Sequence, residues 1–235
     1  MIKCKYSTEP SAFFLAEKTY NKDLETTPCR PRPNFHCVKT SLNPDVIKFF
    51  MNIIEQVRKF VESECKKPSS NYGYDPFLYH FIPVVEYSEK LAGKLGAEKE
   101  IVIIAAWLHD IGSIIHGRKD HHITSAKIAE EKLSEFGYTA EKIEKVRDCI
   151  ISHRGSQQIS PKTLEAKILI EADTLSAFND ITGLFQSALV YEKLSRKEAK
   201  DSVKKKLINK WKQLNLDESR EIIKSKYKAV MLLLE

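Results

Sequence analysis

Apolar residues recur every three to four positions from Asn43 onward, and this period predicts helices through the remainder of the chain. Asn43 suits the N-cap of the first helix and Pro44 its first turn, and the apolar positions that follow share one face. A second helix is expected over about 75–95, ending at Gly96. Pro83 lies inside this second helix and should kink or delay it, because proline lacks the N–H that a helix interior uses.

The next segment, over about 98–111, is apolar almost all round in its middle, IVIIAAWL, and is therefore expected to be a central buried helix. We find no convincing strand, internal repeat or low-complexity tract. The predicted fold class is all-α, a single helical bundle with a C-terminal helical extension. The other helices are expected over 123–136, 140–152, 161–178 with Ser160 as N-cap, 181–194, 195–214 with Ser195 and Glu198 as a capping box, and from Asp217, as N-cap, onward.

These patterns divide the chain into three predicted regions. Residues 1–43 hold four of the nine prolines and three of the five cysteines without a sustained period, which predicts an irregular N-terminal extension. Residues 44–195 are expected to form the helical domain, with the C-terminal helices of residues 196–235 packed on it. The apolar stripe of these last helices needs burial on that core or on a second subunit, which makes a homo-oligomer one alternative; its members are Leu207, Trp211, Leu214, Val230 and Leu233.

Composition narrows the class of protein without identifying a substrate. Of the 235 residues 42% are hydrophobic, which is enough for a core, and the formal charge of +6 suits a solvated surface or an anionic partner. The sequence contains no run of about 18 apolar residues and no signal-peptide stretch, so neither a membrane span nor export is expected. The five cysteines form no disulfide pattern, and a reducing cytoplasm is the expected location.

The candidate chemistry is concentrated in histidines, of which six of the seven lie between positions 80 and 153. The strongest candidate is the adjacent pair His109 and Asp110, at the end of the predicted buried helix. Gly112 would let the chain turn away sharply there and leave both side chains in a cavity. An imidazole beside a carboxylate suits Mn, Fe, Zn, Co or Ni as a ligand set, and Mg less well.

Two further polar residues lie among apolar helix positions, His80 upstream and Asp173 downstream. A carboxylate buried beside Ala172 and Leu175 is costly unless it is paired or bound to a metal. The structural alternatives are a hydrogen-bonded core histidine at position 80 and an aspartate at position 173 that caps the following segment.

The order His80, His109-Asp110 and Asp173 resembles the HD superfamily of metal-dependent phosphohydrolases, over about residues 75–195. The resemblance implies an all-α bundle in which these four residues bind one divalent metal ion. His122, in a segment similar to the family's His-x-x-Ser-Ala, and His153 match two further family histidines. Family members use these two with the bridging aspartate for a second metal, or to hold substrate phosphate or a water.

The expected roles of Asp110 and of the basic residues in the neighbouring loops follow from the chemistry of their side chains. Asp110, beside metal and water, is the natural proton acceptor. Arg118, Lys119 and Arg154 are expected to clamp phosphate oxygens, although the first two also read as exposed loop charges. His121 has no family counterpart and reads as a loop residue, while His116 and His36 read as structural.

The leading hypothesis is a metal-dependent phosphohydrolase that cleaves a phosphate ester or anhydride of a small phosphorylated compound, with nucleotides as the expected class. The alternatives are a dinuclear phosphodiesterase acting on cyclic or oligomeric nucleotides, an iron oxygenase of related fold, and a nucleotide-sensing or RNA-associated regulator without catalysis. The chain has no P-loop, no dinucleotide-binding fingerprint and no basic–aromatic pattern typical of nucleic-acid modules.

Overall fold

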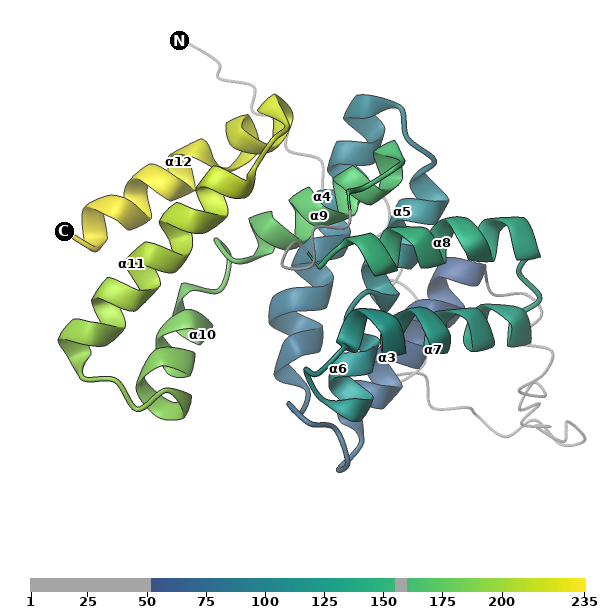
Figure 1. Ribbon diagram of the computed structural model, residues 1–235, viewed down its shortest axis with the longest axis horizontal. Coiled ribbons are helices and arrows are strands. Elements are labelled where there is room, and N and C mark those ends of the chain that lie inside the picture. The colour runs from purple at the N-terminus through teal and green to yellow at the C-terminus, as the bar shows by residue number, and fades with distance from the viewer. Residues whose placement is uncertain (1–51, 155–159) are drawn as a thin grey trace, which may run out of the picture. The chain divides into compact units, whose positions relative to one another are not determined.

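Helices form the regular structure of residues 52–154 and 160–235, the part of the chain that this computed structural model describes (Figure 1). The all-α prediction is confirmed for these residues, among which no strand occurs. The predicted N-terminal extension and the predicted cap at Asn43 lie outside them. In chain order the elements are α3 (Ile53–Lys66), the π-helical turn η1 (Phe77–Phe81), α4 (Ile82–Leu95), α5 (Lys99–Leu108), α6 (Ile111–His116), α7 (His121–Glu135), α8 (Ala140–Ser152), α9 (Leu164–Ser176), α10 (Ile181–Gln186), the π-helical turn η3 (Ser187–Tyr191), α11 (Arg196–Gln213) and α12 (Asp217–Leu233).

Helix α3 begins later than the sequence pattern predicted. Asn52 is its N-cap, with extended backbone, and its side-chain oxygen accepts a hydrogen bond from the Glu55 N–H at 3.1 Å. A helix that runs unbroken from position 44 to Val61 is therefore wrong, because the chain is extended at position 52. The apolar face itself forms as expected, with Val57 and Val61 fully buried.

Pro83 delays the second helix, as predicted, and the delay takes the form of the π-helical turn η1. The Ile82 N–H donates to the carbonyl of Phe77, five residues back, and regular α4 starts only at Ile82. Pro83 then occupies the first turn of α4, where no backbone donor is needed. The helix ends at Gly96 in the left-handed conformation (φ 73°), also as predicted.

Helix α5 is the central helix, and its residues from Ile101 to Leu108 are all buried against α3, α4, α8 and α9. It ends earlier than expected, so that His109 and Asp110 form the bend that leads into α6. Gly112 is not the turning residue and lies within α6. A Cβ at position 112 would lie 2.7 Å from the backbone nitrogen of Ser125, so the glycine serves the close approach of α6 to α7.

Some of the helix caps predicted from the sequence are confirmed by the structure, and others are wrong. The predicted capping box of Ser195 and Glu198 is confirmed at the start of α11. The predicted N-cap Ser160 is wrong, because Thr163 caps α9 by accepting from the Ala166 N–H. Asp217 is likewise the first residue of α12 rather than its cap. The predicted helix over 181–194 divides into α10 and η3.

The last two helices form an antiparallel pair, with α10 next to α11 (Figure 1). Leu207 and Leu214 are fully buried, in agreement with the expected apolar stripe. Leu233 is 82% exposed, so it does not pack on the core of the described chain, and its burial on a second subunit stays a prediction. Trp211 stacks on Tyr227, with ring centroids 4.4 Å apart, and this joins α11 to α12.

Among the described helices, none is by itself long and apolar enough to cross a membrane, although the bent pair Lys99–His116 and His121–Glu135 reaches the required length and composition together.

Candidate metal centre

The bend after α5 places the carboxylate of Asp110 among four histidines that come from different elements. His80 lies in η1, His109 at the end of α5, His121 at the start of α7 and His153 just after α8. His109 and His153 are buried, and His121 is 12% exposed at its side chain. The packing of η1, α5, α7 and α8 therefore creates a cluster that no local segment contains.

The first ligand group consists of His80, His109 and Asp110. The Nε2 atoms of the two histidines lie 3.0 Å apart. Oδ2 of Asp110 lies 3.5 Å from Nε2 of His80 and 3.9 Å from Nε2 of His109. Two imidazole nitrogens and a carboxylate oxygen at this separation can all reach one metal ion.

The second ligand group shares Asp110 through its other oxygen. Oδ1 lies 3.2 Å from Nε2 of His121 and 3.5 Å from Nε2 of His153. These three residues also meet the geometric requirement for a metal site. Asp110 thus belongs to both groups, one on each carboxylate oxygen.

In each of the four histidines, the hydrogen bond that the outer ring nitrogen makes determines which nitrogen faces the cluster. Nδ1 of His109, His121 and His153 each lies at a backbone carbonyl, those of Ala106, Arg118 and Ile150 respectively. A carbonyl only accepts, so each Nδ1 carries the hydrogen and each Nε2 keeps a lone pair directed inward.

His80 is oriented in the same way by a side chain. Ser176 Oγ donates to the backbone carbonyl of Asp173 at 2.7 Å, so its oxygen can accept from Nδ1 of His80 at 3.2 Å. Histidines that ligate metals commonly have this outward hydrogen bond, which sets the tautomer and the ring orientation.

The electrostatics of the cluster favour a neutral His109 imidazole and a charged Asp110 carboxylate. Burial lowers the pKa of His109 to about 4, so this imidazole is neutral near pH 7. Burial acts to raise the pKa of Asp110, but His109, His153 and His80 outweigh it and hold that pKa well below its usual value. For His80 and His153 burial acts to lower the pKa, and the Asp110 carboxylate outweighs it and raises both values. Protons and a metal cation therefore compete for these two Nε2 atoms.

The residues present fit a divalent transition-metal ion. Oδ1 of Asp110 is buried and has no hydrogen-bond partner among the described residues. Such a carboxylate oxygen is costly in a folded protein unless a cation compensates it. The facing Nε2 atoms of His80 and His109 likewise need a proton or a cation between them. A donor set of imidazoles and carboxylates suits Mn, Fe, Co, Ni or Zn.

Asp173, on α9, lies at the edge of the first group. Its Oδ1 is 3.7 Å from Nε2 of His80, and its Oδ2 is 3.5 Å from Nζ of Lys210 on α11. Burial acts to raise its pKa, but the charges of Lys210 and His80 outweigh it and lower that pKa to about 2.

The other predicted site residues lie further out. His122 is buried, and its Nδ1 lies 3.4 Å from a guanidinium nitrogen of Arg154 rather than at Asp110. Arg154 is also 3.6 Å from Oδ1 of Asp120. Arg118 and Lys119 are exposed, and within the described ranges no hydrogen bond or ion pair joins their side chains to the cluster.

Two residues near Asp110 and Asp173 were missed by sequence reasoning. The sequence predicts a loop residue at His121, but its Nε2 lies 3.2 Å from Oδ1 of Asp110. Lys210 carried no signal, because it is one of many lysines on a polar helix. The neighbouring pair His121-His122 was the available signal, because either histidine could face the cluster.

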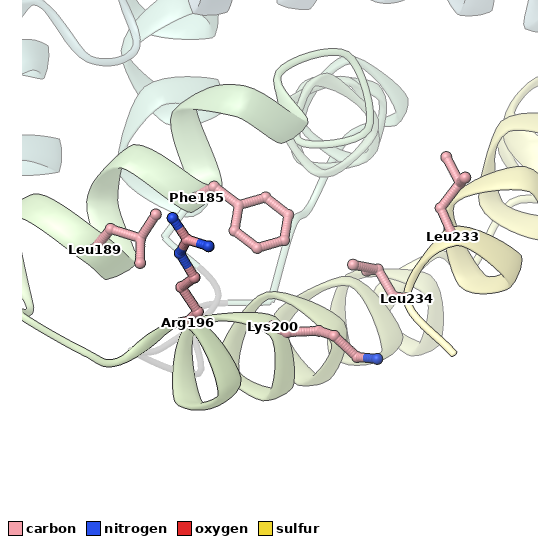
Figure 2. Close-up of a pocket in the computed structure, with 6 residues that line it drawn as sticks. All are labelled: Phe185, Leu189, Arg196, Lys200, Leu233 and Leu234. Atoms are coloured by element: carbon pink, nitrogen blue, oxygen red, sulfur yellow. The ribbon is translucent and has the colours of Figure 1, made fainter.

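A cavity of about 340 Å³ lies elsewhere, between α10, η3, α11 and the end of α12 (Figure 2). Its described lining contains no histidine and no carboxylate side chain, so it lacks metal-ligand chemistry. None of the predicted site residues takes part in it. The lining residues are Phe185, Leu189, Arg196, Lys200, Leu233 and Leu234.

Comparison with known proteins identifies the domain that carries this cluster. The HD domain family model matches residues 77–177, which include all five residues of the two ligand groups. An uncharacterised protein of Clostridium beijerinckii is 33% identical over 103 residues, covering 42% of this chain and 63% of the relative. Ribonuclease Y of Petrotoga mobilis is 32% identical over 110 residues, covering 46% of this chain and 19% of the relative. The chain therefore spans less than two thirds of the length of either curated relative.

Solved structures agree on the fold. The crystal structure of Bacillus subtilis YpgQ in complex with ADP superposes with a TM-score of 0.60 and 23% identity, covering 77% of this chain and 89% of that one. The four predicted ligand positions, His80, His109, Asp110 and Asp173, all lie inside the matched segment. Over residues 77–177 this chain is similar to the HD domain family.

Proposed function

We propose that this protein is a metal-dependent phosphohydrolase that cleaves a phosphate ester or anhydride of a small phosphorylated compound, with a nucleotide as the substrate class. The observation that carries this function is the shared carboxylate of Asp110, which faces inward-directed Nε2 atoms on both of its oxygens. A cluster of this kind binds divalent cations, and divalent cations promote the attack of water on phosphorus.

The residues that would hold the ion are His80, His109, Asp110 and Asp173. A divalent ion there supplies Lewis acidity, which lowers the pKa of a bound water and polarises a phosphoryl oxygen. The chain supplies the remaining functions. Asp110 accepts the proton of the attacking water, because its carboxylate is ionised and lies among the ligand nitrogens.

His122 and Arg154 would bind the substrate beside the second ligand group. His122 lies in the first turn of α7, where the free N–H groups of the helix favour an anion. Arg154 lies 3.4 Å from it and offers a planar guanidinium suited to two phosphate oxygens. The ADP complex of the structurally similar YpgQ supports a nucleotide as ligand of this fold.

A dinuclear phosphodiesterase is the second candidate function. It is favoured by the second ligand group, in which His121 and His153 approach Oδ1 of Asp110. Asp110, His121 and His153 would hold a second divalent ion, and a pair of ions would supply stabilisation of the charge that develops when a phosphodiester is cleaved. Cyclic or short oligomeric nucleotides are the substrates that this arrangement would suit.

The decisive experiment is a phosphate-release and nucleotide-turnover screen on the purified full chain with Mn²⁺, Co²⁺, Ni²⁺, Zn²⁺ or Mg²⁺. Nucleoside mono-, di- and triphosphates and cyclic dinucleotides would be the compounds tested, with Asp110→Ala as the inactive control. Metal-dependent turnover that Asp110→Ala abolishes is the expected result. A metal-loaded wild type that binds nucleotides without turning over any of them would point instead to a regulator, and oxygen consumption with iron to an oxygenase.

We infer a reducing, cytoplasmic environment for this activity. Cys65 and Cys149 are buried as free thiols, and burial raises the pKa of each to about 12, which keeps them protonated and unreactive. Thiols in this state suit a compartment without disulfide formation.

A further inference from the structure

Helix α11 carries the ammonium group of Lys210 to the edge of the candidate metal centre. Nζ of Lys210 lies 3.5 Å from Oδ2 of Asp173, and the other oxygen of this carboxylate lies 3.7 Å from Nε2 of His80. A single carboxylate therefore separates the lysine from the first ligand group. Lys210 lies outside the matched HD domain, in the C-terminal helices.

The position of Lys210 is held by contacts of the residues that follow it in the chain. The next residue, Trp211, stacks on Tyr227 at 4.4 Å, and Tyr227 meets the ring of Phe178 edge-on at 6.0 Å. Just after α11, the backbone N–H of Asn215 donates to Oε1 of the buried Glu171 at 2.7 Å. These contacts anchor α11 near the same helix, α9, that carries Asp173.

The Lys210–Asp173 ion pair contributes little to the stability of the fold. The two side chains are 33% and 24% exposed, and the pair is 3.5 Å apart without a hydrogen bond. Partly exposed ion pairs of this kind contribute little to folding. A positive charge beside Asp173 also opposes the binding of a metal cation, since both compete for one carboxylate.

The opposition to metal binding is relieved if an anion joins the site and takes up the charge of Lys210. We propose that Lys210 binds a phosphoryl oxygen of the substrate on the Asp173 side of the centre, which makes the C-terminal helices part of the substrate site. This assignment rests on the proposed phosphohydrolase function. The lysine side chain suits the role, because its ammonium is a compact charge on a flexible stem that can reach from the carboxylate to a phosphate.

The test compares Lys210→Met, which removes the charge and keeps the length, with Lys210→Arg, which keeps the charge. Lys206→Met is the matched control, because Lys206 lies one turn earlier on α11 and also pairs with a carboxylate, that of Glu192 at 2.7 Å. All variants are made in the full chain and checked for helix content by circular dichroism.

Two binding measurements by isothermal titration calorimetry need no turnover. In the first, Mn²⁺ is titrated into metal-free protein, and Lys210→Met should bind it several-fold more tightly than wild type because a competing charge is gone. In the second, methylenediphosphonate, a non-hydrolysable diphosphate, is titrated into Mn²⁺-loaded protein. Lys210→Met should bind it about 10- to 100-fold more weakly, as expected for one lost hydrogen bond between charged groups. Lys210→Arg and Lys206→Met should stay within a few-fold of wild type.

The outcomes separate this assignment from the proposed function. Unchanged diphosphonate binding in Lys210→Met would overturn the assignment, even if the wild type hydrolyses nucleotides. Weaker Mn²⁺ binding in Lys210→Met would also overturn it, because the lysine would then be holding Asp173 for the metal. Charge-dependent binding of diphosphonate would support the assignment even if the turnover screen finds no substrate.

Discussion

Nε2 of His121 lies 3.2 Å from Oδ1 of Asp110, whereas the next residue, His122, directs its Nδ1 toward Arg154 at 3.4 Å. Consecutive residues of a helix point about 100° apart, so only one of two neighbouring histidines can face the same partner. This relationship favours His121 over His122 as a ligand in the second group, and it supports the proposed substrate contact of His122.

His121→Ala should therefore lower the number of bound Mn²⁺ ions, while His122→Ala should not. If the wild type binds two ions, His121→Ala is expected to bind one, because the second group loses a ligand and the first keeps all of its own. Metal content after gel filtration, measured by plasma mass spectrometry, checks this. Equal loss of metal in both variants would show that His122 is the ligand.

His122→Ala should affect turnover instead. We expect a decrease of roughly 10²-fold, the scale of one lost acid–base or electrostatic contact in a transition state. The measurement is steady-state kinetics on the best substrate of the screen, at saturating metal. Wild-type turnover in this variant would exclude His122 from the site.

Asp110→Asn should prevent metal binding at both groups, because the amide keeps the volume of the side chain but not the charge that each group shares. The matched control is Asp148→Asn, an exposed aspartate on α8, the helix that His153 directly follows. Calorimetric titration with Mn²⁺ should show no high-affinity binding for Asp110→Asn and wild-type binding for Asp148→Asn. Full metal affinity in Asp110→Asn would refute the assignment of the centre.

Gly112→Ala should destabilise the fold by about 2 kcal/mol or more, the usual cost of forcing a methyl group into a packed contact. The added Cβ would lie 2.7 Å from both the Ser125 nitrogen and the His121 carbonyl oxygen. Gly93→Ala is the control, since nothing lies within 4 Å of a Cβ at that helical position. There alanine should stabilise by up to about 1 kcal/mol, through its higher helix propensity. Urea denaturation followed by circular dichroism measures both.

Leu207→Ala should cost about 2–5 kcal/mol, the range for emptying a fully buried leucine site. Leu233→Ala should change the free energy of unfolding by less than about 0.5 kcal/mol, because the side chain is 82% exposed. Both are measured by the same urea denaturation. Similar values for the two variants would mean that Leu233 is covered in solution, as a second subunit would cover it.

The sequence by itself determined the helical class, several helix ends and the identity of the chemical groups. The helical period, the capping box at Ser195 and the stop at Gly96 depend on residues within a few positions of one another. Local patterns of this kind act before any long-range packing. The order of His80, His109-Asp110 and Asp173 also needed no structure to be seen.

Only the tertiary structure decided which atoms meet. His121 and Lys210 reach Asp110 and Asp173 because α7 and α11 pack at particular angles on the helices that carry those aspartates. The role of Gly112 differs from the predicted turn for the same reason. The glycine allows a close approach to Ser125, which comes from another helix. A helical period specifies which face of a segment is buried, but the partner of that face, and the atom it presents, depend on contacts between segments far apart in the chain.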